Sequence, residues 1–466
     1  MGEKIKRRKH FISTLGTGFY TQGIYACEKG RCNTAFVQEA SLKFGLNSQV
    51  DRITICLTDD AEATNWIGRT DSNGQKEKGL KDILEEQYGK EKIETIKMST
   101  GDSTEATDET FDRIYQSIQE NEEIHFDITH GFRYFPMLVL TVLEYAKVTK
   151  NITVGGIYYG EFVRPENGEP VDWPWYDLAY YSDILSWSNA ADAFVRYGNS
   201  NQIKDLVSNL MRVSKKRKEY QSISNMVGAL NNLTKCIETG RGKKSDNPQA
   251  SIQKACEVYK ERFENVKKEG KIRLKPLEVL MDHIDRKVNM LNDENNLSTG
   301  LSVVKWSIDN DMTQQGYTAL EETIKTYVCD LAGVDDDKKW FRESFANALV
   351  KSIIHASSND RKLGYDQWAK TEWDNDELKK IKEANESLED FKSKIRLKGK
   401  KLSETIPEEI IRLESNISEK RNDINHFGFS NKTISNGTLK KDLNKIYEEF
   451  LKVIRENPIP EKICES

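Results

Sequence analysis

Residues 124–138 read IHFDITHGFRYFPML, a sequence in which a polar loop directly follows a short apolar run. The run Ile124–Ile128 has the length and composition of a buried strand, and the apolar residues from Pro136 to Lys147 predict a helix. Thr129–Arg133 then form the loop at the carboxyl end of the strand. The stretch predicts one strand–loop–helix unit of an α/β domain.

The same pattern recurs through the first 165 residues or so. Helices are expected after Tyr20 and over Gly79–Tyr88, Thr107–Asn121 and Pro136–Lys147. The expected strands are His10–Leu15, Arg52–Leu57, Ile93–Met98, Ile124–Ile128 and Val154–Tyr159. Alternating strands and helices predict a Rossmann-like, doubly wound, mainly parallel sheet. In such sheets ligands bind beyond the carboxyl ends of the strands, so the loops there are the candidate site.

The first of these loops contains Gly16-Thr17-Gly18. A dinucleotide-binding fingerprint needs a third glycine where this chain has Thr21, and an acidic residue about 20 positions further on. Asp59 and Asp60 lie more than forty residues downstream of Gly16. NAD or FAD binding is therefore disfavoured. Two interpretations stay open: a turn whose backbone N–H groups approach a phosphate, or simply a tight strand-to-helix turn.

The loop Thr129–Arg133 carries more chemistry. The Arg133 guanidinium can hold a phosphate with two hydrogen bonds, Thr129 and His130 can donate hydrogen bonds, and Gly131 permits close approach of the backbone. Such a set favours a phosphorylated ligand. The alternative is a structural loop histidine beside a surface arginine.

From about Tyr176 onward the strand pattern is replaced by apolar residues at helical spacing. Basic loops are expected at Gly240–Gln249 and Leu397–Lys401, and the run Lys215–Lys218 is either an RNA contact or a solvated surface. Helices are expected at Leu178–Tyr197, Ile203–Val213, Ser222–Ile237, Ser251–Lys268, Pro276–Leu291, Leu320–Leu331, Trp340–Ala356, Glu377–Ile395, Pro407–Asn425 and Leu439–Glu456.

Charge is divided between the two halves. The 466 residues carry a net charge of −5, to which residues 1–200 contribute −9 and residues 201–466 contribute +4. The longest apolar stretch, Met137–Leu143, is far shorter than a membrane span, and seven scattered cysteines favour a reducing compartment. We therefore expect a soluble cytoplasmic protein without a membrane partner. Cys27 and Cys32 lack the further ligands of a zinc site, so no metal is expected.

Several segments together resemble CRISPR-associated proteins in which a CARF sensor domain is joined to a HEPN ribonuclease domain, the Csx/Csm type. These segments are LGTGFY (Leu15–Tyr20), TAFVQEA (Thr34–Ala40), LTDDAEATNW (Leu57–Trp66), DITHGFRYFPML (Asp127–Leu138) and IYYGEF (Ile157–Phe162). The pattern W-x2-A-x3-F-x2-Y-G from Trp187 to Gly198 continues the resemblance.

The resemblance implies a CARF-like domain over 1–177, a helical connector over 178–200 and an all-helical HEPN-like domain over 201–466. It also implies a homodimer or higher homo-oligomer in type III CRISPR antiviral defence. The activator would be a cyclic oligoadenylate, with tetra-adenylate favoured over hexa-adenylate, and no other cofactor is expected. Whether the CARF domain cleaves its activator is left open. The implied activator-binding residues are Gly16, Thr17, Gly18, Phe19, Thr58, Thr129, His130, Gly131 and Arg133.

The segment Arg421-Asn422-Asp423-Ile424-Asn425-His426 is an R-x4-H pattern, as in HEPN nucleases. Chance alone gives about one such match in a chain with 6 histidines, so the pattern gains weight only from its place in the penultimate expected helix. Five residues advance a helix by about 500°, so Arg421 and His426 share no helical face unless the helix ends between them. The loop Phe427–Asn431 could then turn His426 toward a cleft. A site formed by the motifs of two protomers also resolves the geometry.

The resemblance implies metal-independent cleavage of single-stranded RNA, in which the 2′-OH of the substrate attacks the phosphorus and leaves a 2′,3′-cyclic phosphate and a 5′-OH. His426 suits proton transfer, Arg421 would stabilise the phosphorane oxygens, and Asn422 would orient either group. The alternative is a non-catalytic cyclic-oligoadenylate sensor or adaptor that acts through protein contacts. An ordinary nucleotide-cofactor enzyme is disfavoured by the incomplete fingerprint.

Overall fold

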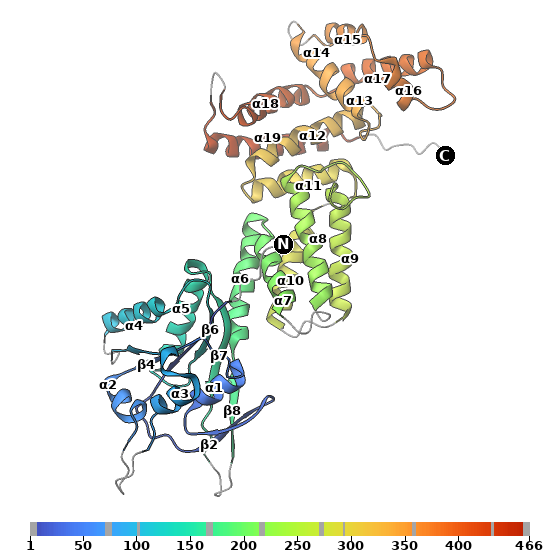
Figure 1. The fold of residues 1–466 in the computed structure, drawn as a ribbon. Coiled ribbons are helices and arrows are strands. Elements are labelled where there is room, and N and C mark those ends of the chain that lie inside the picture. The colour runs from blue at the N-terminus through green and yellow to red at the C-terminus, as the bar shows by residue number, and fades with distance from the viewer. Residues whose placement is uncertain are drawn as a thin grey trace. The chain divides into compact units, whose positions relative to one another are not determined.

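The protein is described here from a computed structural model, whose chain divides into two compact units, Met1–Ser186 and Trp187–Ser466 (Figure 1). The expected domain boundaries at 177 and 200 stay predictions. Among the described residues, every helix is too short or too polar to cross a membrane. The structure describes residues 7–69, 77–99, 103–164, 171–213, 220–269, 275–291, 294–356, 360–429 and 433–459.

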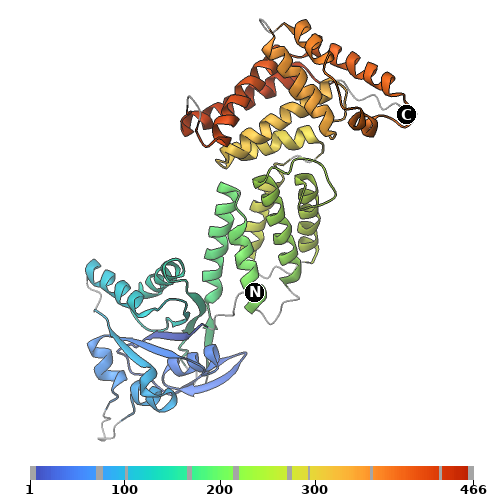
Figure 2. The same ribbon diagram turned by 45° about the horizontal axis from the view of Figure 1, so that its top comes forward.

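One eight-stranded sheet forms the centre of the first unit, in the order β3-β2-β8-β7-β6-β1-β4-β5 (Figures 1 and 2). Its strands are β1 (Lys9–Thr14), β2 (Gly23–Cys27), β3 (Gly30–Thr34), β4 (Arg52–Leu57), β5 (Ile93–Lys97), β6 (Glu123–Asp127), β7 (Thr153–Gly160) and β8 (Asp172–Asp177). All five expected strands are present, and they form the parallel part of the sheet. The α/β, Rossmann-like prediction is confirmed.

The helix expected after Tyr20 is present between β1 and β4, but it begins only at Val37. The chain first forms the antiparallel hairpin β2–β3, where no strands were expected, and β2 also pairs with β8. Gly30 has a φ of +128°, a conformation that favours glycine, at the hairpin turn. The indole of Trp173 covers Gly23 so closely that a Cβ atom at this position would lie 2.2 Å from the ring. Tertiary packing of β2 against β8 therefore decides this segment.

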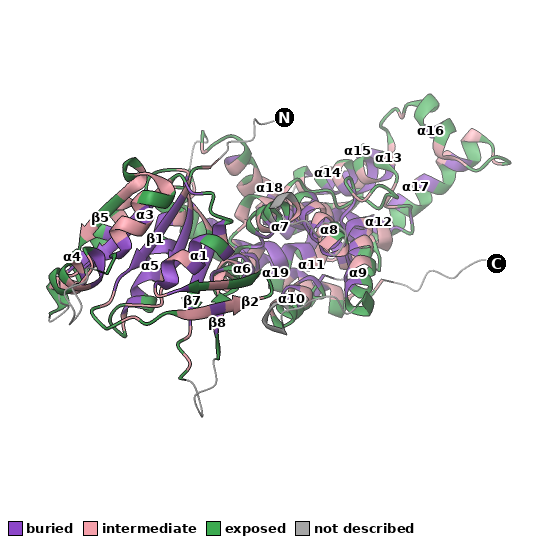
Figure 3. Ribbon diagram, turned by 60° about the horizontal axis from the view of Figure 1, so that its bottom comes forward, coloured by how far each residue is buried: buried purple, intermediate pink, exposed green. Residues whose placement is uncertain are grey.

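Helices cover both faces of the sheet. On one face α1 (Val37–Leu46) and α3 (Leu80–Tyr88) pack on apolar residues of β1 and β4, and on the other α4 (Thr104–Ser117) and α5 (Phe135–Thr149) pack on β6 (Figure 1). Figure 3 shows the central strands as largely buried. Buried strands with helices on both sides explain why the parallel strands are continuous apolar runs.

The amino ends of the central strands hold a buried polar cluster. His10 of β1 lies 3.1 Å from Glu122 through Nδ1 and 2.7 Å from the Thr54 hydroxyl of β4 through Nε2. Arg52 donates from Nη1 to the carbonyl of Ser117 at 2.6 Å. Burial lowers the pKa of His10, in spite of its carboxylate partner. These contacts join three neighbouring strands at the end opposite the candidate ligand loops.

The topology places those loops at one point. Strand β1 pairs with β4 on one side and with β6 on the other, so the chain crosses over β1 between β5 and β6. This is the switch point of a doubly wound sheet, where a crevice opens beyond the carboxyl ends of the strands. The loops that follow β1 and β6 flank that crevice, as the sequence predicts.

Every regular element described in the second unit is a helix. The unit comprises α7 (Asn201–Val213), α8 (Gln221–Glu238), α9 (Ile252–Glu269), α10 (Lys275–Val288), α11 (Asn296–Asp309), α12 (Thr313–Leu331), α13 (Lys339–Phe341), the π-helix Arg342–Leu349, α14 (Val350–His355), α15 (Arg361–Ala369), α16 (Asn375–Ile381), α17 (Leu388–Thr405), α18 (Glu408–Asn425) and α19 (Asn436–Glu456). The connecting helix α6 (Ala179–Tyr197) precedes them.

Two apolar cores stabilise this unit. One lies among the end of α6 and helices α7–α11, and the other among α11, α12 and the helices up to α19. In Figures 1 and 2, α8 and α9 lie side by side. The predicted all-helical character is thereby confirmed for the described residues.

Three local expectations in the helical unit need comment. The basic stretch Leu397–Lys401 is part of helix α17, because Gly399 packs directly against the ring of Trp368. The expected helix Glu377–Ile395 is interrupted between α16 and α17, where the Ser387 hydroxyl caps a new helix by accepting from the Asp390 N–H. Lys215–Lys218 lies outside the described residues.

Candidate functional site

The loop after β1 is fixed by one buried asparagine. Asn65, on the π-helical turn Glu62–Trp66, donates from Nδ2 to the carbonyl of Gly16 at 2.7 Å and to that of Gly18 at 2.9 Å. Arg69 donates to the carbonyl of Gly18 as well, at 2.9 Å. Two carbonyl groups of a four-residue loop are therefore turned toward one side.

This arrangement aims the N–H groups of Thr17 and Phe19 the other way. In a planar trans peptide the C=O and the following N–H point in opposite directions. Neither N–H takes part in a hydrogen bond within the described part of the chain. The Phe19 ring is 87% exposed and lies 3.8 Å from the Arg69 guanidinium. The loop thus offers two unused donors and an aromatic face, which suit an anionic group next to a base.

The second loop, after β6, is anchored from below by Asp127. The buried carboxylate accepts the Thr129 N–H at 3.0 Å and the Ser41 hydroxyl. Burial raises the pKa of Asp127 to about 6. The Thr129 hydroxyl oxygen in turn accepts the Gly160 N–H at 2.9 Å. The loop is held on both sides before it reaches the crevice.

His130 and Tyr20 join the two loops. Their rings stack with centroids 4.7 Å apart, and the Tyr20 hydroxyl accepts the Gly16 N–H at 2.8 Å. The Thr14 hydroxyl donates to the carbonyl of His130. Burial lowers the pKa of His130 to about 4, so the imidazole is neutral at pH 7. His130 acts here as a neutral hydrogen-bonding group and adds no charge for an anion.

The rest of the predicted loop residues differ in exposure. Gly131 has a φ of +119°, and a Cβ there would lie 3.2 Å from Phe135, so a larger residue would be strained. Arg133 is exposed, and its guanidinium forms no hydrogen bond or ion pair with the described residues. Thr58 caps a short helix by accepting the Ala61 N–H at 3.3 Å. Of the predicted set, Gly16–Phe19 and Thr129–Gly131 are brought together.

Asn65, Arg69 and Tyr20 were not predicted to contribute. All three contact the loop after β1 with side chains. Asn65 and Tyr20 belong to segments that carry the family resemblance, and Arg69 lies three residues beyond one of them. Arg69 also donates to the side-chain oxygen of Asn65 at 2.9 Å. The four-residue spacing of this asparagine and arginine is the feature of the sequence that could have indicated the pair.

The R-x4-H pattern lies at the end of α18. The helix ends at Asn425, and His426 is its C-cap, whose N–H donates to the carbonyl of Asn422 at 2.9 Å. The side chains of Asn422 and His426 are exposed. Arg421 turns the other way and is 32% exposed, with Nη1 at 2.9 Å from Glu321. Within one protomer, the structure does not bring Arg421 and His426 together.

Arg421 ends a chain of ion pairs along α12. Glu321 lies 2.9 Å from Lys325, and Lys325 lies 2.8 Å from Glu322. Glu322 also accepts from Arg342 at 2.8 Å. Glu321 and Lys325 are both buried, so their charges depend on their ion-pair partners: Lys325 on Glu322 and Glu321, and Glu321 on Lys325 and Arg421. The guanidinium of Arg421 is therefore held in a fixed place.

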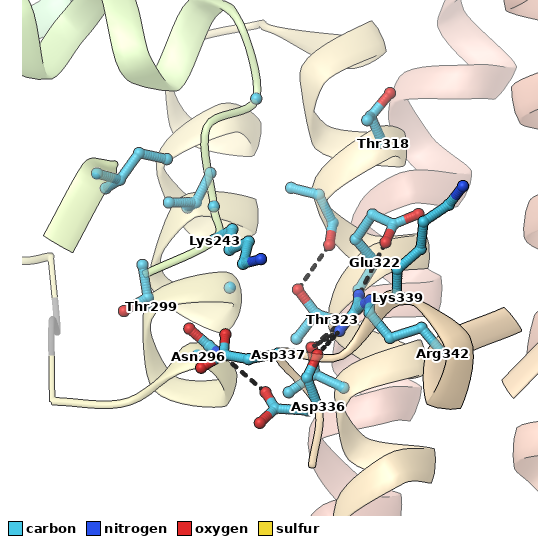
Figure 4. A pocket seen from close by; sticks show the side chains of 17 residues that line it. Lys243, Asn296, Thr299, Thr318, Glu322, Thr323, Asp336, Asp337, Lys339 and Arg342 are labelled. Atoms are coloured by element: carbon cyan, nitrogen blue, oxygen red, sulfur yellow. Dashed lines mark hydrogen bonds and ion pairs between the residues drawn. The ribbon is translucent and has the colours of Figure 1, made fainter. Parts of the chain in front are cut away.

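The far end of this chain lines a cavity of about 500 Å³ (Figure 4). Glu322 and Arg342 form one side, and Asn296 donates to Asp336 at 2.8 Å and to Asp337 at 3.0 Å on another. Small residues of α11 and α12 form much of the remaining wall. The cavity and Arg421 thus share the same ion-pair chain.

A further carboxyl group lies beside this chain. Glu414 of α18 is 2% exposed, and neither of its carboxyl oxygens has a hydrogen-bond partner among the described residues. Burial, and next the charge of Glu321, raise the pKa of Glu414 to about 7. No role was predicted for Glu321, Lys325 or Glu414. The spacing of apolar residues in the sequence predicts the helices that carry them, but it does not indicate which of their charged residues come together.

Within the described residues, no group of three or more histidine, cysteine, aspartate or glutamate side chains has the arrangement needed to hold a metal ion. His125 is a buried residue of β6, with Nδ1 at 2.5 Å from the Tyr158 hydroxyl and Nε2 at 2.8 Å from Glu123.

Comparisons with known proteins agree with this architecture. Residues 10–162 match the family model of the CARF domain of the CRISPR system endoribonuclease Csx1, and residues 183–294 match that of the second domain of CRISPR-associated protein MJ1674. The chain is 25% identical over 344 residues to CRISPR-associated protein MJ1674 of Methanocaldococcus jannaschii. That match covers 72% of this chain but 47% of the relative, so the chain spans about half of the relative's length.

A solved structure of Enterococcus italicus Csm6 bound to cyclic hexa-2′-fluoro-hexa-dAMP is similar over 98% of this chain and 96% of its own, with a TM-score of 0.42 and 12% sequence identity. The family match covers the sheet and the loops that flank its switch point. These findings identify the chain as a CRISPR-associated protein with an N-terminal CARF domain.

Proposed function

We propose that the chain is a cyclic-oligoadenylate-activated, metal-independent endoribonuclease that cleaves single-stranded RNA in type III CRISPR antiviral defence. One observation carries the sensor half of the proposal: the unused N–H groups of Thr17 and Phe19 face away from Asn65, at the switch point of the sheet. Backbone donors of this kind bind phosphate oxygens without a net positive charge. This suits a domain in which residues 1–200 carry a charge of −9.

The nuclease half is supported by the pattern at the end of α18. The exposed imidazole of His426 is free to transfer a proton, and Arg421 is held in place for the charge that develops on a phosphorane. The reaction uses the 2′-OH of the substrate, so DNA would not react. The family model matched by residues 10–162 also carries the name of an endoribonuclease.

A site shared by two protomers reconciles these positions. Because Arg421 points inward and His426 outward, the two groups of one chain do not converge on one phosphate. In a homodimer, the two exposed His426 side chains would face one another with Arg421 behind them. The same separation favours a second candidate function, a non-catalytic sensor or adaptor in which Arg421 only stabilises the helical unit.

One experiment distinguishes the two functions. Labelled single-stranded RNA is incubated in EDTA with the full chain, with and without cyclic tetra-adenylate or hexa-adenylate, and the products are resolved. The same reactions are run in parallel without EDTA. We expect stimulated cleavage by the wild type in both conditions and a loss of about a hundredfold or more in His426→Ala. His283→Ala, an exposed histidine on α10, is the matched control and should retain activity.

Absence of stimulated cleavage, or full activity of His426→Ala, would reject the nuclease and leave the adaptor. Activity that disappears only in EDTA would reject the metal-independent reaction. For the sensor half, Arg133→Ala should weaken binding of the cyclic oligoadenylate in calorimetry, and an unchanged affinity would reject the role of Arg133.

A further inference from the structure

Two exposed phenylalanines follow the candidate catalytic histidine directly. Phe427 is 90% exposed and Phe429 is 88% exposed. Large apolar side chains on a surface mark contact sites when they gather next to functional groups. Neither ring is used by the reaction proposed above.

The backbone at Phe427 is unfavourable for a side chain. The Gly428 N–H donates to the carbonyl of Asp423 at 2.8 Å, and the Phe427 N–H to that of Ile424 at 3.1 Å. These are the two hydrogen bonds of a Schellman motif, which places a left-handed residue, usually glycine, just after the C-cap. Phe427 occupies that position with a φ of +59°, although Gly428 comes directly after it. Helix termination alone therefore does not explain a phenylalanine here.

The loop that presents the rings is fixed by its own hydrogen bonds. The Phe429 N–H donates to the carbonyl of His426 at 3.0 Å, and the Thr433 hydroxyl donates to that of Gly428 at 2.7 Å. The buried Asp423 carboxylate accepts the Ile434 N–H at 3.1 Å. Both sides of the loop are thus tied to the end of α18, so the rings are held beside His426.

We infer that Phe427 and Phe429 stack on unpaired bases of the RNA next to the cleaved bond, and so restrict the substrate to single strands. This inference rests on the proposed nuclease function. Aromatic rings bind any base by stacking, and each stacked base contributes about 1–3 kcal/mol to affinity. A base within a duplex is stacked on its neighbours and is unavailable to these rings.

The surroundings favour RNA over a second protein surface. The exposed residues on the same end of α18 are Asn422, Asn425 and His426, all of them polar. A stable protein interface buries about 800 Å² on each partner around an apolar centre, and two rings among polar side chains supply only a fraction of that. Hydrogen-bonding groups around an aromatic platform are instead typical of a surface that binds nucleotides.

The test uses a substitution that the fold should accept. Phe427→Gly restores the preferred residue of the Schellman motif, so its melting temperature should equal or exceed that of the wild type. Its affinity for a single-stranded RNA, measured by fluorescence anisotropy, should be weaker by about five- to a hundredfold. Phe427→Trp should keep the affinity, and Leu397→Ala, which removes a 69% exposed apolar side chain of α17, is the control.

A second measurement shows whether bases are contacted. RNAs with one abasic nucleotide are compared with intact RNA. The wild type should bind the abasic RNA more weakly, and the difference between the two RNAs should be smaller for Phe427→Gly, which keeps only the ring of Phe429. Equal RNA affinity of wild type and Phe427→Gly would overturn the inference. A loss of dimer mass in light scattering with unchanged RNA affinity would also overturn it, since the rings would then contact another protein. Binding is read without cleavage, so failure of the nuclease proposal remains separately visible.

Discussion

The loops at the switch point and the R-x4-H segment are held in place by different kinds of contact. Around Gly16 and Thr129, side chains bind backbone groups, and the resulting crevice carries few charges of its own. Around Arg421, charged side chains bind each other in an interior of low polarity. In the first region the two loops contact each other within one chain through Tyr20 and His130, whereas the second keeps its arginine and its histidine apart.

The difference shows how each region can respond to a ligand. A site made from aimed N–H groups needs no rearrangement of charge when an anion binds. A buried ion-pair chain is sensitive, because loss of one member leaves its neighbours uncompensated in a medium that penalises isolated charge. We therefore expect substitutions in the second region to affect stability most, and substitutions in the first to affect binding.

The largest effect is expected for Glu321→Ala. It removes the carboxylate shared by Lys325 and Arg421, and we expect the helical unit to lose about 3 kcal/mol of unfolding free energy in urea titrations. Lys339→Ala, which breaks the exposed pair with Glu343, is the control and should cost less than about 0.5 kcal/mol. If both variants lost the same unfolding free energy, the buried ion-pair chain would contribute no more to stability than an exposed ion pair.

A smaller effect, with a defined pH dependence, is expected for Glu414→Gln. The pKa of Glu414 is raised from 4.5 to about 7 in the folded protein. Between these values the unfolded chain releases a proton that the native state still binds, so this group lowers stability as the pH rises from 4.5 to 7, and its effect is constant above 7. Glu414→Gln has no ionisable group at this position, so its unfolding free energy does not fall for this reason as the pH rises.

The measurement is the unfolding free energy of wild type and Glu414→Gln at pH 4.5 and pH 8. The variant should be more stable by about 2–3 kcal/mol at pH 8, with the difference vanishing toward pH 4.5. Glu419→Gln, on an exposed position of the same helix, should show no such pH dependence. A difference that is the same at both pH values would contradict the assigned ionisation.

The smallest effect is expected in the first region, from Asn65→Ala. The substitution removes the donor that holds the carbonyls of Gly16 and Gly18, so the N–H groups of the loop lose their common direction. We expect the Kd for the cyclic oligoadenylate to rise about tenfold in calorimetry, with little change in stability. Thr64→Ala, on the same turn, removes only a bond to the Asp60 carbonyl and should bind normally.

The sequence predicted the parts of the fold that repeat a periodic pattern. The five strands that it predicted are runs of five to eight residues rich in apolar side chains, and the loops follow from them by topology. The hairpin β2–β3 was missed, because its strands are short and β2 depends on pairing with β8, about 150 residues later in the chain. Leu397–Lys401 was predicted to be a loop because it is basic and contains a glycine. In the structure this glycine, Gly399, lies within helix α17 and packs against Trp368.

The residues that complete each site were beyond such reasoning. Asn65 contacts a loop 47 residues earlier in the chain, and Glu321 contacts an arginine 100 residues later. Contacts between residues so far apart in the chain depend on how helices and strands pack. A single sequence does not indicate which two residues will meet. Helix geometry excludes a shared face for Arg421 and His426 only while both lie in one helix, and α18 ends at Asn425, between them.

The cluster of His10, Arg52 and Glu122 has a consequence for how the first unit can change over evolutionary time. It joins the strands at the end of the sheet that no ligand reaches, so much of the cohesion of the sheet is independent of the loops. Substitutions in Gly16–Phe19 or Thr129–Arg133 can then accumulate without unfolding the domain. The loops can thus change the ligand that they bind while the sheet that carries them stays the same.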